Sequence, residues 1–295
     1  MPLNCGGRPL DLGRVVVMGI LNITPDSFSD GGVFFVRDKA VARAREMVEQ
    51  GAAIIDIGGE STRPGAQAVS VQEELDRVLP VIEALHAAVP VVLSIDTSKP
   101  AVMRAAVAAG AGLINDVMAL RAEGAVLTAA GLGVPVCLMH MQGEPRSMQD
   151  NPQYADVVAE VRQFLAGRRK VCVDAGIPQE HILLDPGFGF GKTLAHNCAL
   201  LRDLQRLRDL GAPLLVGLSR KSMIGKALGL PVEQRLHASL ALATLAVQNG
   251  ASIVRTHDVA ATRDAIRMTE IVLTSDTNVA CPPQEPLSIS LQQCE

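Results

Sequence analysis

Polar and charged residues stand at or near the ends of eight short apolar runs in this 295-residue chain. They include carboxylates, amides, an imidazole and cations, which a hydrophobic core excludes unless each has a partner. Because the runs recur from one end of the chain to the other, we expect distant segments to assemble one site. The residues concerned are Asn22, Glu60, Asp96, Asn115, Asp116, His140, Asp185, Ser219, Arg220, Lys221, Arg255 and His257.

The runs that carry these residues are continuous stretches of Val, Ile and Leu, which are typical of parallel strands buried on both faces. Segments with helical spacing lie between them, near residues 38–50, 71–87, 99–109, 122–131, 154–175, 195–210, 232–249 and 258–274. This alternation predicts an α/β fold, the TIM (β/α)₈ barrel, whose chemistry lies where the strands end. We expect one catalytic domain over 15–274, a short N-terminal hairpin or plug over 1–14, and a disordered C-terminal tail over 275–295.

Composition limits the kinds of function. The formal net charge is -4 and no dense stripe of Lys and Arg is present, which argues against binding to nucleic acid. The six cysteines form no CxxC pair, which favours a reducing, cytoplasmic setting over a disulfide or zinc framework. No apolar run has the length of a signal peptide or a membrane span, so we expect a soluble protein without membrane contact.

Two neighbouring runs near the C-terminal end are followed by cations, at residues 219–222 (SRKS) and 255–257 (RTH). Loops after the seventh and eighth strands of such barrels often bind phosphate. Arg offers two parallel hydrogen bonds to a phosphate and Lys adds a point charge. We therefore expect an anion site here. His140, between two methionines, is equally compatible with a site residue and with a buried histidine.

The Gly-rich segment 185–193 (DPGFGFGKT) is not a phosphate-binding loop, because that motif requires Gly where Pro186 stands. Its alternation of Gly and Phe favours a ligand-binding loop. The glycines would let the backbone approach a flat ligand closely, and a Phe ring would form one wall of the binding site. The alternative is a turn that packs both Phe side chains into the barrel rim. Segments 22–32 and 58–65 are rich in turn-forming residues, and we expect mobile loops there rather than ordinary surface turns.

These motifs resemble those of the bacterial dihydropteroate synthases, in the same order and spacing over residues 15–274. The resemblance implies a TIM barrel, usually a homodimer, that joins 6-hydroxymethyl-7,8-dihydropterin diphosphate to p-aminobenzoate. The products would be 7,8-dihydropteroate and diphosphate, on the folate pathway, with Mg²⁺ as cofactor and sulfonamides as competitors of p-aminobenzoate. The matching segments are MGILNITPDSFSDGG (18–32), DIGGESTRPGA (56–66), SIDTSKP (94–100), INDV (114–117), CLMHMQG (137–143), LLDPGFGFGK (183–192), GLSRKSMIG (217–225) and VRTHDV (254–259).

The same resemblance implies a role for each matching residue. The pterin-binding residues would be Asp96, Asn115, Asp185 and Lys221. The residues that meet the diphosphate would be Asn22, which is also the Mg²⁺ ligand, Thr62, Arg63, Arg255 and His257. The p-aminobenzoate site would be formed by Phe28, Thr62, Pro64, Phe190 and Ser222, and Asp30 would be a first-loop carboxylate facing the reacting centre. The catalytic residues would be Asp96, Lys221, Arg63, Arg255 and His257.

These residue types suggest a dissociative displacement at the pterin methylene. Cations and Mg²⁺ would stabilise the departing diphosphate, while Asp96 and Asp185 would favour the positive charge left on the pterin. We therefore expect the carboxylates and the cations at opposite ends of the site.

Two other functions are compatible with parts of this sequence. A Schiff-base lyase using Lys221 needs an apolar pocket that lowers the pKa of the amine, whereas the neighbouring residues are polar. A module that presents methyltetrahydrofolate to a corrinoid protein would share the barrel and the pterin carboxylates, but it would not need Arg63, Arg255 and His257. A catalytically silent relative is disfavoured because every motif position is filled. One departure from the family is the apolar segment 33–36 after the first loop.

Overall fold

The computed structural model describes residues 2–23, 33–61, 67–144 and 148–274, with only the backbone of 33–36. Eight parallel strands form its sheet, in the order β8-β7-β6-β5-β4-β3-β10-β9. A bridge between Leu184 and Leu214 joins the two outer strands, which closes the barrel and confirms the predicted fold. The strands are β3 (Val16–Asn22), β4 (Ile54–Gly58), β5 (Val92–Asp96), β6 (Leu113–Asp116), β7 (Val136–Met139), β8 (Ile182–Asp185), β9 (Leu215–Gly217) and β10 (Ile253–Thr256).

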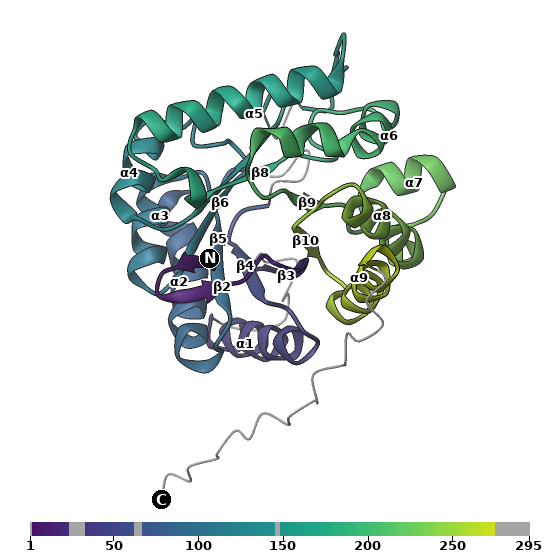
Figure 1. Ribbon diagram of the computed structural model, residues 1–295. Helices are drawn as coiled ribbons and strands as arrows, with labels where there is room; N and C mark the ends of the chain where they lie inside the picture. Colours follow the sequence, from purple (N-terminus) through teal and green to yellow (C-terminus); the bar gives the residue numbers. More distant parts are fainter. Residues whose placement is uncertain (1, 24–32, 62–66, 145–147, 275–295) are drawn as a thin grey trace, which may run out of the picture.

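Helices surround this barrel (Figure 1). They are α1 (Val33–Glu49), α2 (Val71–Ala88), α3 (Pro100–Ala108), α4 (Ala125–Leu132), α5 (Val157–Asp174), α6 (Leu194–Arg202), α7 (Ser222–Leu228), α8 (Leu236–Gln248) and α9 (Val259–Thr274). Three differ from the prediction. Helix α1 begins at Val33, so the apolar segment 33–36 is its first turn, and the segment predicted as one helix over 195–210 divides into α6 and a 3₁₀ helix, Leu204–Leu210. Helix α7 has 7 residues, too few for its periodicity to be recognised.

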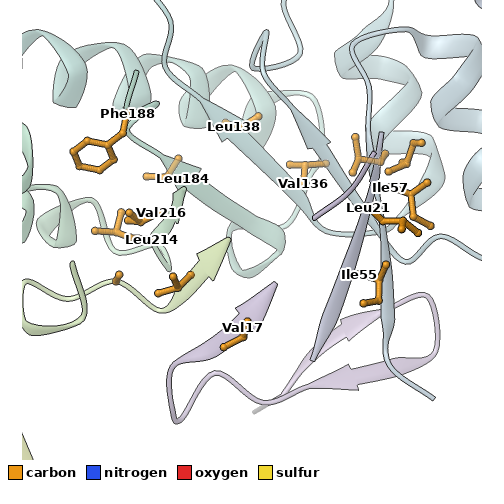
Figure 2. Packing of buried hydrophobic residues seen from close by; sticks show 14 of the residues in the cluster. Val17, Leu21, Ile55, Ile57, Val136, Leu138, Leu184, Phe188, Leu214 and Val216 are labelled. Atoms are coloured by element: carbon orange, nitrogen blue, oxygen red, sulfur yellow. The ribbon is translucent and has the colours of Figure 1, made fainter. Parts of the chain in front are cut away.

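The core has two layers because successive side chains of a strand point to opposite faces. The outer layer fills the space between strands and helices, and Figure 2 shows part of it, including Val17, Ile55 and Val216. The inner layer is an apolar plug within the barrel to which every strand contributes one side chain. Its members are Met18, Ile54, Val92, Leu113, Cys137, Leu183, Leu215 and Ile253.

A hairpin of β1 (Leu3–Cys5) and β2 (Arg8–Leu10) precedes the barrel, as predicted. Leu3, Cys5 and Leu10 are buried against the inner layer, so the hairpin covers the amino end of the barrel. Close contact there requires Gly112, because a Cβ at this position would lie 2.2 Å from the carbonyl oxygen of Cys5. The carboxyl end is the end left for chemistry. The segment predicted as a disordered tail, 275–295, lies outside the described residues.

No helix in the described ranges is long and apolar enough to cross a membrane. Four cysteines lie in these ranges, and all are free thiols: Cys5, Cys137, Cys172 and Cys198.

Candidate active site

Polar side chains from different strands meet above the inner apolar layer. A residue two positions after an inward-facing one faces inward as well, because the side-chain period of a strand is two. Thus Asp56 follows Ile54, and Asn115, Asp185 and Arg255 likewise follow inner-layer residues of their own strands. The strands therefore deliver polar groups to one pocket at the carboxyl end. That pocket is lined by Asp96, Asn115, Val117, Met139, Asp185, Phe190, Gly217, Lys221 and Arg255.

Arg255 joins two carboxylates on the floor of this site. Its Nε donates a hydrogen bond to Oδ2 of Asp56 over 2.6 Å, and its Nη2 donates to Oδ2 of Asp96 over 2.9 Å. Burial lowers the pKa of Arg255, but the two carboxylates outweigh this and hold it above its usual range. Burial raises the pKa of Asp96 to about 7, although Arg255 opposes the shift. Asp96 therefore titrates near neutral pH.

The expected separation of carboxylates from cations is wrong for Arg255, and a second cation, Arg220, is paired with a carboxylate that was not part of that expectation. Arg255 lies between carboxylates because a buried carboxylate is strongly destabilising without a cation beside it. Arg220 lies in a two-point ion pair, with its Nε 2.9 Å and its Nη2 2.5 Å from the carboxylate oxygens of Asp258. Arg220 is thus neutralised by Asp258 and does not line the pocket. It is not part of the anion site predicted for residues 219–222.

Asp56 is a site residue that the sequence reasoning did not select. It is fully buried, and its Oδ2 accepts hydrogen bonds from Nδ2 of Asn115 over 3.0 Å and from Nε of Arg255. The bond turns the amide nitrogen of Asn115 toward Asp56 and the amide oxygen away from it. The signal in the sequence is a carboxylate inside the apolar run 53–57. Asp56 was not predicted as a site residue because the candidates were the polar residues at the ends of the runs.

Asp185 and Lys221 both line the pocket, and their charges interact. Oδ1 of Asp185 accepts a hydrogen bond from the backbone N–H of Gly187 over 2.7 Å. Burial raises the pKa of this carboxyl group, with Lys221 opposing the shift. Lys221 donates to the carbonyl oxygen of Phe188, and its Nζ lies 4.7 Å from the ring centroid of Phe190. Burial lowers the pKa of Lys221 to about 8, so it is still mainly a cation at pH 7.

Asn22 ends β3 beside Gly58 of β4. A Cβ at Gly58 would lie 3.6 Å from Oδ1 of Asn22 and 3.8 Å from Oδ2 of Asp96, so both oxygens face this small residue. No group of three His, Cys, Asp or Glu side chains in the described ranges could hold a metal by itself. Mg²⁺ fits these residues nevertheless, because it commonly takes one or two protein oxygens and completes its shell with phosphate and water.

Ser219 and His257 connect the carboxyl ends of β9 and β10. Ser219 Oγ lies 3.0 Å from Nδ1 of His257 and also accepts the backbone N–H of His257 over 3.2 Å. Arg43 of α1 donates to the carbonyl oxygen of His257 over 3.1 Å. These bonds hold His257 at the carboxyl end of β10, two residues after Arg255. Ser222, the first residue of α7, is exposed and directly follows Lys221.

The Gly-rich segment after β8 combines both structures considered for it. Phe188 is fully buried in the core, whereas Phe190 lines the pocket as the expected aromatic wall. Gly187 has φ +69°, and a Cβ there would lie 1.9 Å from the carbonyl oxygen of His140. This glycine therefore serves a close approach to the end of β7 rather than to a ligand.

His140 is a buried structural residue, the second of its two possible roles. It is 5% exposed and packs edge-to-face on Phe164, with 4.9 Å between ring centroids. Burial, reinforced by Lys192, lowers the pKa of His140 to about 3, so the ring is neutral at physiological pH.

Five of the residues expected in the site lie outside the described ranges, so their positions stay predictions: Phe28, Asp30, Thr62, Arg63 and Pro64.

Comparison with known proteins identifies the family. Residues 18–257 match the family described as pterin binding enzyme. The dihydropteroate synthase of Haemophilus influenzae is 53% identical over 91% of this chain and 98% of its own. The Escherichia coli (strain K12) synthase is 52% identical over 94% of this chain and 99% of its own.

Solved structures agree in fold. The dihydropteroate synthase of Xanthomonas albilineans with 4-aminobenzoic acid has a TM-score of 0.88 and 55% identity, and covers 92% of this chain and 98% of its own. The Yersinia pestis synthase in a sulfonamide drug complex has a TM-score of 0.89 and 52% identity, and covers 93% of this chain and 100% of its own. The chain therefore belongs to the pterin-binding enzymes and, among them, to the dihydropteroate synthases.

Proposed function

We propose that the pocket between Asp96, Asn115, Asp185 and Lys221 holds the pterin ring of 6-hydroxymethyl-7,8-dihydropterin diphosphate. The enzyme joins this substrate to p-aminobenzoate, giving 7,8-dihydropteroate and diphosphate. The observation that carries the proposal is the convergence of these four side chains, from β5, β6, β8 and the start of α7, on one pocket. A related Xanthomonas albilineans synthase, 52% identical, has been solved with 7,8-dihydropteroate.

The carboxylates have two tasks in this proposal. They accept hydrogen bonds from pterin N–H groups, which orients the ring, and they favour positive charge on it. When the bond from the methylene carbon to the diphosphate oxygen breaks, its electron pair leaves with the diphosphate. The remaining cation is delocalised into the pterin close to Asp96 and Asp185. Fixed charges in a dry pocket stabilise such a transition state more strongly than water does.

The diphosphate is assigned to the rim of the pocket. Nε and Nη2 of Arg255 bind Asp56 and Asp96, so Nη1 is the donor we assign to the leaving group. His257, Thr62 and Arg63 complete this proposed set. Asn22 would hold Mg²⁺, which when bound neutralises negative charge on the diphosphate.

The arylamine then attacks the methylene carbon and releases a proton, and because it is neutral at pH 7 it needs no strong base. We assign its site to Phe28, Thr62, Pro64, Phe190 and Ser222, where sulfonamides would compete, with Asp30 facing the reacting carbon. Binding is proposed to be ordered, with the pterin first. Tight binding of p-aminobenzoate in calorimetry without diphosphate and Mg²⁺ would contradict that order.

The proposal also covers the domain, the oligomeric state and the cellular location. It includes a single catalytic domain over 15–274, a homodimer and a cytoplasmic location. The thiols of Cys5, Cys137 and Cys172, which are buried and unpaired, support a reducing setting.

One assay tests the function directly. Purified protein is supplied with the pterin diphosphate, and diphosphate release is followed with and without p-aminobenzoate and Mg²⁺. We expect rapid release only with all components, together with an equal amount of 7,8-dihydropteroate. Release at the same rate without p-aminobenzoate, or release without dihydropteroate, would refute the proposed reaction.

The Schiff-base lyase deserves a test because burial lowers the pKa of Lys221 to about 8. Its hydrogen bond to the carbonyl oxygen of Phe188 and its interaction with the charge of Asp185 favour a cation that orients substrate. Borohydride treatment in the presence of substrate should leave the mass of the protein unchanged.

A further inference from the structure

Lys192 is a buried cation that the proposed reaction does not use. Its side chain is 2% exposed, and its Nζ contacts the carbonyl oxygens of Gly187 at 2.9 Å and Phe190 at 3.0 Å. It also lies 2.9 Å from Nδ1 of His140, which accepts because the ring is neutral. A fourth contact, to the carbonyl oxygen of His140, is longer at 3.5 Å. An ammonium has three hydrogens, and the three shorter contacts account for them. Lys192 thus ties the loop after β8 to itself and to the end of β7.

This loop, residues 186–193, has little regular structure, so side chains bind its backbone groups. Gln149 donates to the carbonyl oxygen of Gly189 over 2.6 Å, and Tyr154 donates to that of Gly191 over 2.8 Å. Asn197 accepts from the N–H of Gly189 over 2.7 Å. Asn197 also donates to the carbonyl oxygens of Lys192 and Thr193 at the end of the loop, over 3.3 Å and 2.7 Å. Among these side chains, Lys192 is the one that binds the carbonyl of Phe190 itself.

The rings of Phe188 and Phe190 depend to different degrees on the hydrogen bonds that Lys192 makes to the loop. Phe188 is fully buried, so core packing holds it in place. Phe190 is only half-buried, lines the pocket and lies under Lys221. Its ring therefore relies on the backbone for its position, and its carbonyl is one of the two that Lys192 binds.

Burying Lys192 opposes folding, which argues that its geometry is what matters. Desolvation lowers the pKa of Lys192 to about 7, with Asp185 opposing the shift. An apolar side chain of similar volume is often as stable as a buried charge or more so. What an apolar side chain lacks is three directed donors.

We infer that Lys192 is a positioning residue for the arylamine site, holding the Phe190 carbonyl so that the Phe190 ring forms a fixed wall beside Lys221. The inference rests on the proposed role of Phe190 in binding p-aminobenzoate. It makes Lys192 selective for one substrate. The pterin side of the pocket is held by Asp96, Asn115 and Asp185. None of them hydrogen-bonds to Lys192, and Asp185 interacts with it through charge alone.

The test is a comparison of Michaelis constants in Lys192→Met. We expect the KM for p-aminobenzoate to rise about 5-fold, the effect of losing about one hydrogen bond, and the KM for the pterin diphosphate to change less than about 2-fold. Leu200→Ala is the matched control, because Leu200 is fully buried in neighbouring α6 and makes no bond to the loop. It should lower the unfolding temperature and leave both KM values unchanged.

A double variant tests whether Lys192 acts through Phe190. In a Phe190→Ala background, Lys192→Met should raise the KM for p-aminobenzoate by less than about 2-fold, because coupled residues are not additive. Equal factors in both backgrounds would overturn the inference, as would a lower unfolding temperature with an unchanged KM, or an equal rise for both substrates.

If Lys192→Met does not fold, Tyr154→Phe replaces it. This variant removes only the bond to Gly191, next to Phe190, and should raise the KM for p-aminobenzoate about 2-fold with the same selectivity. No change would overturn the inference. Failure of the wild-type protein to form dihydropteroate would instead refute the proposed function, and so the two failures are distinguishable.

Discussion

Arg255 and Asp56 are 199 positions apart in the sequence, yet Nε of the arginine lies 2.6 Å from Oδ2 of the aspartate. The same Oδ2 accepts the amide of Asn115, and Arg255 reaches on to Asp96. One buried carboxylate therefore orients Asn115 and Arg255 directly, and Asp96 through the guanidinium of Arg255. The network links β4, β5 and β6 to β10.

Replacing Asp56 by Asn should weaken this network. Breaking one side of a buried ion pair leaves the partner uncompensated, and we expect the free energy of unfolding to fall by about 3 kcal/mol. Pterin affinity should fall as well, because Asn115 and Asp96 lose their alignment. Urea denaturation and calorimetry measure the two effects. Asp258→Asn is the control, since it breaks the more exposed Arg220 pair and should have the smaller effect on stability and none on pterin affinity.

Replacing Asp185 by Ala should abolish pterin binding. The carboxylate is buried at the pocket wall, and a ligand N–H deprived of a charged acceptor loses affinity by about 100-fold. Calorimetric titration with a pterin measures this change. An affinity equal to that of the wild type would refute the role assigned to Asp185.

Asp96 should make stability depend on pH. Its pKa in the folded protein, about 7, lies above that of the unfolded chain, so the folded state binds the proton more tightly. The stability contributed by Asp96 is present below about pH 4 and is lost as the pH rises through about 7. From pH 5 to pH 8, Asp96→Asn should therefore lose less stability than the wild type in urea denaturation. Parallel curves for the two proteins would show that Asp96 is not the group responsible.

Asn22→Ala should raise the Mg²⁺ concentration needed for half-maximal activity by about 10-fold, because one oxygen ligand is lost while phosphate and water ligands remain. The unfolding temperature in a chelator should equal that in Mg²⁺ for both proteins, because substrate supplies much of the proposed shell. An unchanged Mg²⁺ requirement would remove Asn22 from the metal site.

The barrel and most of the pocket could be predicted from the residues alone. Strands buried on both faces must be apolar throughout, so the eight runs were recognisable, and polar residues near their carboxyl ends could be assigned to one mouth. Asp96, Asn115, Asp185 and Lys221 line the same pocket for this reason. The family motifs added expectations of role that spacing alone does not contain.

Which charged side chains pair with one another follows from the folded arrangement and not from the pattern along the chain. Arg220 pairs with Asp258, Arg255 lies between Asp56 and Asp96, and Lys192 binds His140 and its own loop. Such contacts depend on strand register, on closure between β8 and β9, and on side-chain direction. A pattern along the chain records which residues face the barrel interior. It does not record which of the facing residues lie within hydrogen-bonding distance across it, because that distance is set by strands far apart in sequence.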